Sequence, residues 1–190
     1  MKIGQILYSY RGYAAVPFFI AGIALANPGD DLMIFGAILM IFGEILRIIS
    51  VGYLGVSSRA RTIVTEKLVT NGPYAYLRNP MYVGNIFIYM GASIFAGGWL
   101  PYLLYLVILF FSIQYSFIAK YEEMCLEDTH KEKYTEYKET VPRFYPRLSP
   151  YPKKSKEKIE LTSALISEKT TFFAIIGFIV LVRFVFYFKS

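Results

Sequence analysis

The sequence predicts an all-α fold, a polytopic membrane helix bundle with about five transmembrane helices. Of its 190 residues, 55% are hydrophobic and only 18% are charged, whereas soluble domains carry about 25% charged residues. The apolar residues gather in long stretches, and the charged residues lie almost entirely between them. This composition excludes a disordered tail and a disulfide-stapled secreted module.

The apolar stretches follow one another within a single predicted domain, residues 1–190. The turn sequence Asn-Pro-Gly-Asp-Asp at 27–31 separates the first two, and Gly-Gly-Trp at 97–99 separates the third from the fourth. The first and third stretches are short for a membrane span, so their helices are expected to extend into flanking aromatic residues. The predicted spanning helices are residues 10–27, 32–50, 81–98, 99–121 and 164–188.

The first stretch has a second interpretation, as a cleaved secretory signal. Lys2 and Arg11 would form its positive leader, and Ala24-Leu25-Ala26 fits a cleavage site. We favour a retained helix, because the short turn at 27–31 is typical of a tight hairpin between two helices.

The basic residues predict how the bundle is oriented. They lie in the N-terminal stretch (Lys2, Arg11), in the segment 51–80 and in the segment 120–169, whereas the turns at 27–31 and 97–99 have none. Since cytoplasmic loops collect Lys and Arg, we expect the N-terminus and both polar segments in the cytoplasm, and the C-terminus outside. The positive charge is therefore explained by membrane topology, and a nucleic-acid partner is not expected.

Two charged residues fall inside the second predicted helix. Glu44 and Arg47 are three residues apart and share one face. They are either a functional pair, because charges within the bilayer are costly, or an intrahelical pair whose arginine reaches the cytoplasmic surface. The sequence leaves both alternatives open.

Several kinds of chemistry are excluded by what the chain lacks. Cys125 is the only cysteine and His130 the only histidine, so neither an intrachain disulfide nor a zinc site is possible. No metal site is predicted. The polar residues that remain as candidates lie in two cytoplasmic segments, about residues 66–84 and 120–147.

The first polar segment is expected to turn and then start a helix. Asn71-Gly72-Pro73 is a turn signal, and Pro80 suits the first turn of a helix. Arg78 and Asn79 would therefore lie at a helix N-terminus near the membrane surface. Free backbone N–H groups beside a cation suit an anionic ligand group such as a carboxylate.

The second polar segment continues the fourth predicted helix and then returns along the surface. Tyr134, Tyr137 and Val141 recur with helical spacing, which predicts an amphipathic helix. Glu122 and Glu123 lie at the membrane boundary. Because neighbouring helical residues point about 100° apart, one of the two is expected to face the bundle and the other the surface.

The two segments carry a pair of motifs. The first is Leu68-Val69-Thr70-x-Gly72-x-Tyr74-x3-Arg78-Asn79-Pro80-x-Tyr82-x-Gly84, and the second is Glu122-Glu123-x2-Leu126 followed by Tyr134-x2-Tyr137-x3-Val141-Pro142-Arg143. Together and in this order they resemble the isoprenylcysteine carboxyl methyltransferase family, whose architecture phospholipid N-methyltransferases share.

This resemblance implies an integral-membrane methyltransferase that uses S-adenosylmethionine and acts on a lipid or prenylated substrate from the bilayer. It implies catalytic roles for Arg78 and Glu122, with Glu122 as the inward-facing acid. The residues that it implies around the cofactor are Lys67, Leu68, Val69, Tyr74, Asn79, Pro80, Met81, Tyr82, Glu122 and Glu123.

The chain departs from the family pattern at two positions. Asn79 stands where the family often has His, and Asn cannot carry a proton near neutral pH, so Asn79 is expected only to bind. Lys120 is the only basic residue where isoprenylcysteine enzymes have an Arg tied to the substrate carboxylate. The alternatives are a membrane NADPH-dependent lipid reductase, and a non-catalytic scaffold or transporter.

The charge pattern makes the topology testable with reporter fusions. Fusions after Arg61 and after Lys154 are expected to report a cytoplasmic position, and a fusion after Ser190 an external one. A cytoplasmic reading at Ser190 would show that one span is assigned wrongly.

Overall fold

The computed structural model describes residues 2–55 and 67–189, and within these ranges it contains helices and no strand. This confirms the predicted all-α class. Arg59, Arg61 and Glu66 of the predicted polar segments lie outside the described residues. The helices are α1 (Lys2–Tyr10), α2 (Val16–Ala24), α3 (Asp30–Leu54), η2 (Gly72–Ala75), α4 (Pro80–Ala96), α5 (Tyr102–His130), α6 (Glu132–Thr140) and α7 (Leu161–Lys189).

The predicted first spanning helix, residues 10–27, is wrong in form. The chain there makes two short helices, α1 and α2, joined by a turn at residues 11–15. Pro17 lies in the first turn of α2, where its missing N–H costs no hydrogen bond, so a new helix starts there. The nine residues of α2 extend about 14 Å, which is too short to cross a bilayer without the flanking chain.

Within residues 2–55 and 67–189, three helices are long and apolar enough to span a membrane, namely α3, α5 and α7. The apolar helix α4 has 17 residues, at the lower limit of about 17–25 residues for a span. Helix α5 runs past the predicted end at residue 121 to His130, because residues 121–130 contain neither glycine nor proline. It ends at Lys131, which has a φ of +47°.

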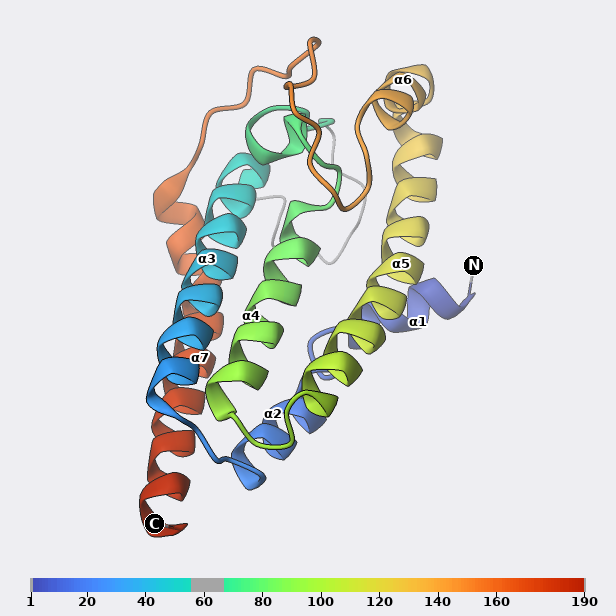
Figure 1. The fold of residues 1–190 in the computed structure, drawn as a ribbon. Helices are drawn as coiled ribbons and strands as arrows, with labels where there is room; N and C mark the ends of the chain where they lie inside the picture. Colours follow the sequence, from blue (N-terminus) through green and yellow to red (C-terminus); the bar gives the residue numbers. More distant parts are fainter. Residues whose placement is uncertain (1, 56–66, 190) are drawn as a thin grey trace.

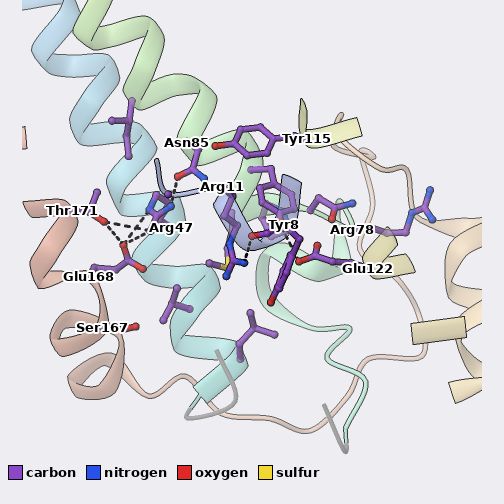
Figure 2. Close-up of a pocket in the computed structure, with 18 of the residues that line it drawn as sticks. Tyr8, Arg11, Arg47, Arg78, Asn85, Tyr115, Glu122, Ser167, Glu168 and Thr171 are labelled. Carbon is purple, nitrogen blue, oxygen red and sulfur yellow. Dashed lines mark hydrogen bonds and ion pairs between the residues drawn. The ribbon is translucent and has the colours of Figure 1, made fainter. Parts of the chain in front are cut away.

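The long helices pack side by side (Figure 1). Helix α4 contacts both α3 and α5, α7 contacts α3, and α1 packs against α5. The helices η2 and α6 and the segment that follows α6 gather at one end of the bundle, whereas the C-terminus lies at the opposite end. A cavity reaches from the end with η2 and α6 into the bundle (Figure 2).

Paired glycines let α3 and α4 approach backbone to backbone. A Cβ atom at Gly43 would lie 2.5 Å from the carbonyl oxygen of Gly84, and one at Gly36 would lie 2.6 Å from that of Gly91. Real Cβ atoms do not come this close to another backbone, so each position requires glycine. Small residues at such crossings are characteristic of membrane helix pairs, where close packing replaces the hydrophobic effect.

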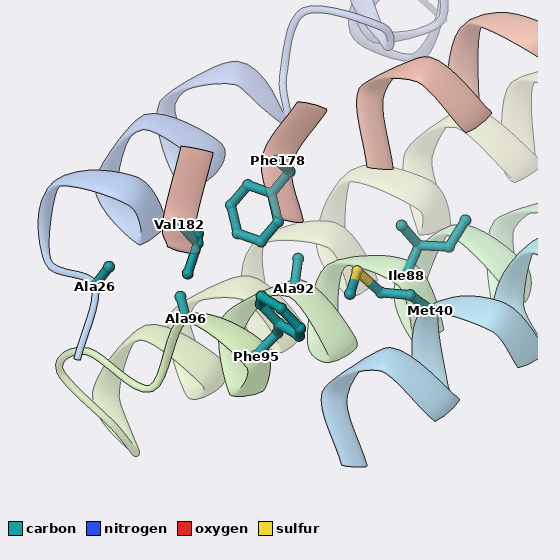
Figure 3. Close-up of a cluster of buried hydrophobic side chains, with 8 residues drawn as sticks. All are labelled: Ala26, Met40, Ile88, Ala92, Phe95, Ala96, Phe178 and Val182. Atoms are coloured by element: carbon teal, nitrogen blue, oxygen red, sulfur yellow. The ribbon is translucent and has the colours of Figure 1, made fainter. Parts of the chain in front are cut away.

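The apolar core lies where α7 covers this helix pair. Ala26, Met40, Ile88, Ala92, Phe95, Ala96, Phe178 and Val182 form one buried cluster (Figure 3). The outward faces are also apolar: Ile34, Ile38 and Ile45 on α3 and Phe173 and Phe184 on α7 are at least half exposed. Apolar residues on both the inner and outer faces are expected of helices surrounded by lipid.

The glycine contacts between α3 and α4 can be tested by adding one methyl group. Gly43→Ala is expected to lower the free energy of unfolding by about 1–3 kcal/mol, because the helices must move apart. Gly177→Ala on α7 is the matched control, because a Cβ atom there meets nothing within 4 Å. Thermal unfolding in detergent micelles measures both variants, and equal stability of the two would contradict the close approach.

Candidate active site

A cavity of about 550 Å³ lies among the turn between α1 and α2, helices α3 to α7 and the segment that precedes α4. Its volume is in the range of about 300–1,000 Å³ that is typical of small-molecule sites. Its wall combines aromatic and aliphatic residues with charged groups from separate helices. Figure 2 shows Glu122 and Arg78 on one side of it, and Arg47, Glu168 and Thr171 on the other.

Most of the predicted site residues meet at this cavity. Lys67 is the exception among them, because its side chain is exposed and is not part of the lining. The two sequence motifs, separated by about 40 positions and the α4–α5 hairpin, contribute the remaining lining residues Leu68, Val69, Tyr74, Arg78, Asn79, Pro80, Met81, Tyr82, Glu122 and Glu123.

The segment before α4 is positioned by backbone pairing with the chain after α6. The Arg78 N–H donates to the Pro142 carbonyl at 2.9 Å, and the Tyr151 N–H donates to the Ala75 carbonyl at 2.8 Å. These bonds hold the motif against the chain that follows α6. Helix α4 then starts with Pro80 in its first turn and with no side-chain cap from Asn79, so its first N–H groups stay available at the site.

The two neighbouring acids of α5 both face inward, and the prediction that one faces the surface is wrong. Glu122 lines the cavity and accepts a hydrogen bond from the Tyr82 hydroxyl at 2.7 Å. Glu123 is only 4% exposed. The chain after α6 covers this face of α5 and brings Arg143 to Glu123, with nitrogen–oxygen distances of 2.8 and 2.7 Å.

Arg78 is held by Glu123 but keeps unused donors. Its Nη1 lies 3.2 Å from a carboxylate oxygen of Glu123, and its side chain is 10% exposed. The buried Nε atom has no hydrogen-bond acceptor among the residues that the structure describes, and Nη1 meets Glu123 as an ion pair without hydrogen-bond geometry. A buried charged donor without an acceptor is costly, and it favours an anionic group bound in the cavity.

Helix α6 forms the aromatic wall over this end, as its spacing predicts. Tyr134, Tyr137 and Val141 are buried, and the Tyr137 hydroxyl donates to the Tyr74 carbonyl at 2.7 Å. Burial raises the pKa of Tyr137 above its usual value. The phenol therefore stays protonated at neutral pH and keeps this donor, which ties α6 to the first motif.

On the other side of the cavity, Arg47 was singled out by the sequence, but its partners Asn85, Glu168 and Thr171 were not predicted. Arg47 donates to Glu168 at 3.1 and 2.5 Å and also to Asn85. The Thr171 hydroxyl donates to the same carboxylate oxygen at 3.0 Å. The intrahelical contact with Glu44 is longer, at 3.6 Å. The available signal was Glu168 itself, an acid inside the last apolar stretch.

The N-terminal turn adds two further cavity residues that were not predicted. Tyr8 and Arg11 both line the wall. The guanidinium of Arg11 lies 3.9 Å from the centre of the Tyr8 ring, and it donates to the Tyr8 carbonyl at 2.8 Å. The break between α1 and α2 brings these residues to the site. The predicted unbroken helix over 10–27 did not indicate this position.

These features define an integral membrane protein whose helix bundle holds an internal cavity with charged walls. The family model for phospholipid methyltransferases matches residues 32–133, which is more than half of the chain. The protein belongs to this family of membrane methyltransferases that act on lipids. The matched range includes Arg47, Arg78 and Glu122, and ends before α7. Neither the curated proteins nor the solved structures contain a match.

The double ion pair of Glu123 gives a testable stability difference. Glu123→Gln removes the charge that two arginines share, and breaking a buried pair costs on the order of 3 kcal/mol. Glu127→Gln is the matched control on the same helix, because within the described ranges Glu127 forms its ion pair with the half-exposed Lys138, and such pairs contribute under about 1 kcal/mol. Thermal unfolding of both variants checks the difference, and equal melting temperatures would contradict it.

Proposed function

We propose that the protein is an S-adenosylmethionine-dependent methyltransferase with a lipid or lipidated acceptor, and that the cavity holds both substrates. The observation that carries the proposal is the meeting of the two sequence motifs at one cavity wall. S-adenosylmethionine supplies an electrophilic methyl group on a sulfonium. The protein's own task is to align donor and acceptor and to exclude water.

The groups near α4 fit the carboxylate of that cofactor. Arg78 offers a buried Nε–H donor that lacks an acceptor among the described residues. The uncapped first turn of α4 offers backbone N–H groups at the same place, and a helix N-terminus favours an anion. Glu123 and Arg143 do not need to touch the cofactor for this role, since their contacts hold the Arg78 side chain in place.

Glu122 and the aromatic wall fit the remaining parts of the cofactor. Among the described residues the carboxylate of Glu122 accepts one hydrogen bond, from Tyr82, and it therefore has lone pairs left for ribose hydroxyls or an ammonium. Tyr82 is itself stacked on Tyr115, with ring centres 4.6 Å apart, which fixes its hydroxyl. Tyr74, Tyr134 and Tyr137 add aromatic surface that suits an adenine ring or a sulfonium.

Calorimetry on detergent-purified protein tests the cofactor directly. We expect S-adenosylmethionine and S-adenosylhomocysteine to bind and NADPH not to bind. Arg78→Ala should weaken S-adenosylmethionine about 10- to 100-fold, because a hydrogen bond to a charged group contributes about 1.5–3 kcal/mol. Glu122→Gln should abolish methyl transfer while the protein stays folded, since Gln keeps the size and loses the charge.

The matched control for Arg78→Ala is Arg183→Ala on α7, an exposed arginine outside the cavity lining. Its affinity for S-adenosylmethionine should equal that of the wild type. Binding of NADPH in place of S-adenosylmethionine would overturn the proposal in favour of a reductase. Binding of neither compound would favour a non-catalytic protein.

A further inference from the structure

Cofactor binding does not explain a second cluster of polar residues in the cavity wall. It consists of Arg47 on α3, Asn85 on α4, and Glu168 and Thr171 on α7, and all four residues line the cavity wall. Figure 2 shows them together, on the side away from Arg78. Helix α7 lies outside residues 32–133, the range shared with the family model.

Stability alone does not explain this cluster. The side chains of Arg47 and Glu168 are only 14% and 4% exposed, between helices that are apolar along most of their length. Buried ion pairs contribute little compared with apolar residues of the same volume. Charged groups within membrane helices that face an internal cavity instead mark a functional site.

The arrangement of charges favours a cationic ligand over an anionic one. Arg47 has two carboxylates beside it: Glu168 in direct contact, and Glu44 at 3.6 Å. Both oxygens of Glu44 lack a hydrogen-bond partner among the described residues, and the residue is 4% exposed. If a cation binds Glu168, Arg47 retains Glu44 as its counterion. If an anion binds Arg47, two carboxylates are left to share one guanidinium.

We infer that Glu168 is the residue that recognises the polar end of the methyl acceptor, and that it selects an amine, bound in its ammonium form, over a carboxylate. Before methyl transfer the ammonium would give one proton to the Glu168 carboxylate, which frees the nitrogen lone pair. The nitrogen–carbon bond would then form as the sulfur–carbon bond of S-adenosylmethionine breaks and S-adenosylhomocysteine leaves. This inference rests on the proposed function, because an acceptor site exists only if the protein transfers a methyl group.

Arg47, Asn85 and Thr171 are positioning residues. Arg47 and Thr171 donate hydrogen bonds that orient the Glu168 carboxylate, and the Asn85 side-chain oxygen accepts one from Arg47 and so holds the arginine in place. Helix α7 thereby supplies acceptor recognition, while the segment shared with the family holds the donor.

The surroundings of Glu168 fit an acceptor that arrives from the bilayer. The cavity wall continues from Glu168 along α7 to Ala174 and Ile175, which are apolar and suit an acyl or prenyl chain. The outer face of the same helix exposes Phe173 and Ile176, as expected of a helix in contact with lipid. The headgroup of a lipid would therefore reach Glu168 while its chain stays in apolar surroundings.

The test compares two acceptor probes in detergent micelles with S-adenosylmethionine as donor. One probe is lysophosphatidylethanolamine, which carries an amine, and the other is an S-farnesylated N-acetylcysteine, which carries a free carboxylate. Wild-type protein should methylate the amine probe preferentially. Glu168→Gln should raise the KM for the amine probe about 10- to 100-fold, and should change the Kd of S-adenosylmethionine less than about twofold.

Glu127→Gln on α5 is the matched control, because it removes an acid that lies outside the cavity lining and should change neither constant. Glu168→Asp keeps the charge, so its KM for the amine probe should lie between those of Glu168→Gln and the wild type. This partial rescue also serves as the readout if Glu168→Gln folds poorly. An unchanged KM in Glu168→Gln would reduce the cluster to a structural ion pair, and an equal loss of S-adenosylmethionine affinity would move Glu168 to the donor side.

The failure of this inference is distinguishable from the failure of the proposed function. Binding of lysophosphatidylethanolamine can be measured by calorimetry without any donor. Wild-type binding that Glu168→Gln weakens would support the acceptor site even if no methyl transfer occurred. Equal binding by both proteins, or preference of the wild type for the farnesylated carboxylate, would overturn the inference.

Discussion

The close contact between α3 and α4 is the constraint on which the site depends. Gly43 and Gly84 face each other so closely that neither tolerates a Cβ atom, and a Cβ at Gly84 would also lie 2.7 Å from the Arg47 Cγ. Arg47 lies one turn after Gly43 on the same face of α3. Its side chain therefore passes over Gly84 to reach Asn85 and Glu168. The glycines that allow the helices to pack also leave the space in which this arginine crosses the helix pair.

The balance between acids and arginines differs on the two sides of the cavity. On the side near α6, Glu123 neutralises two arginines, and the backbone of the chain after α6 fastens the same segment. On the side of α7, two acids share one arginine. The first group therefore has donors to spare for an anion, and the second has acceptors to spare for a cation. A ligand pair with opposite charges at its two ends would match both groups.

Local sequence signals predicted the parts of the site that are determined locally. Pro80 starts α4, and the spacing of Tyr134, Tyr137 and Val141 gives the buried face of α6, because both depend on residues within a few turns. The motifs also predicted which residues share the cavity, with Lys67 as the exception. The inward position of Glu123 was missed because Arg143, which covers it, lies 20 positions along the chain. The break at residues 11–15 was missed because an apolar run hid the effect of Pro17.

The residues hardest to predict were those that pair across the bundle, and this follows from how a membrane protein uses charge. Arg47 and Glu168 are 121 positions apart, and the sequence offers Arg47 a nearer partner in Glu44, one turn away on the same helix. In lipid an isolated charge is so unfavourable that it requires a partner. An arginine in one apolar stretch and an acid in another are therefore candidate partners, even where a nearer acid lies on the same helix. Applied to this chain, the rule connects α3 with α7, since Glu168 is the buried acid of the last helix. The pairing then joins α7, which lies outside the family match, to the wall of the cavity, where we propose that it meets the acceptor.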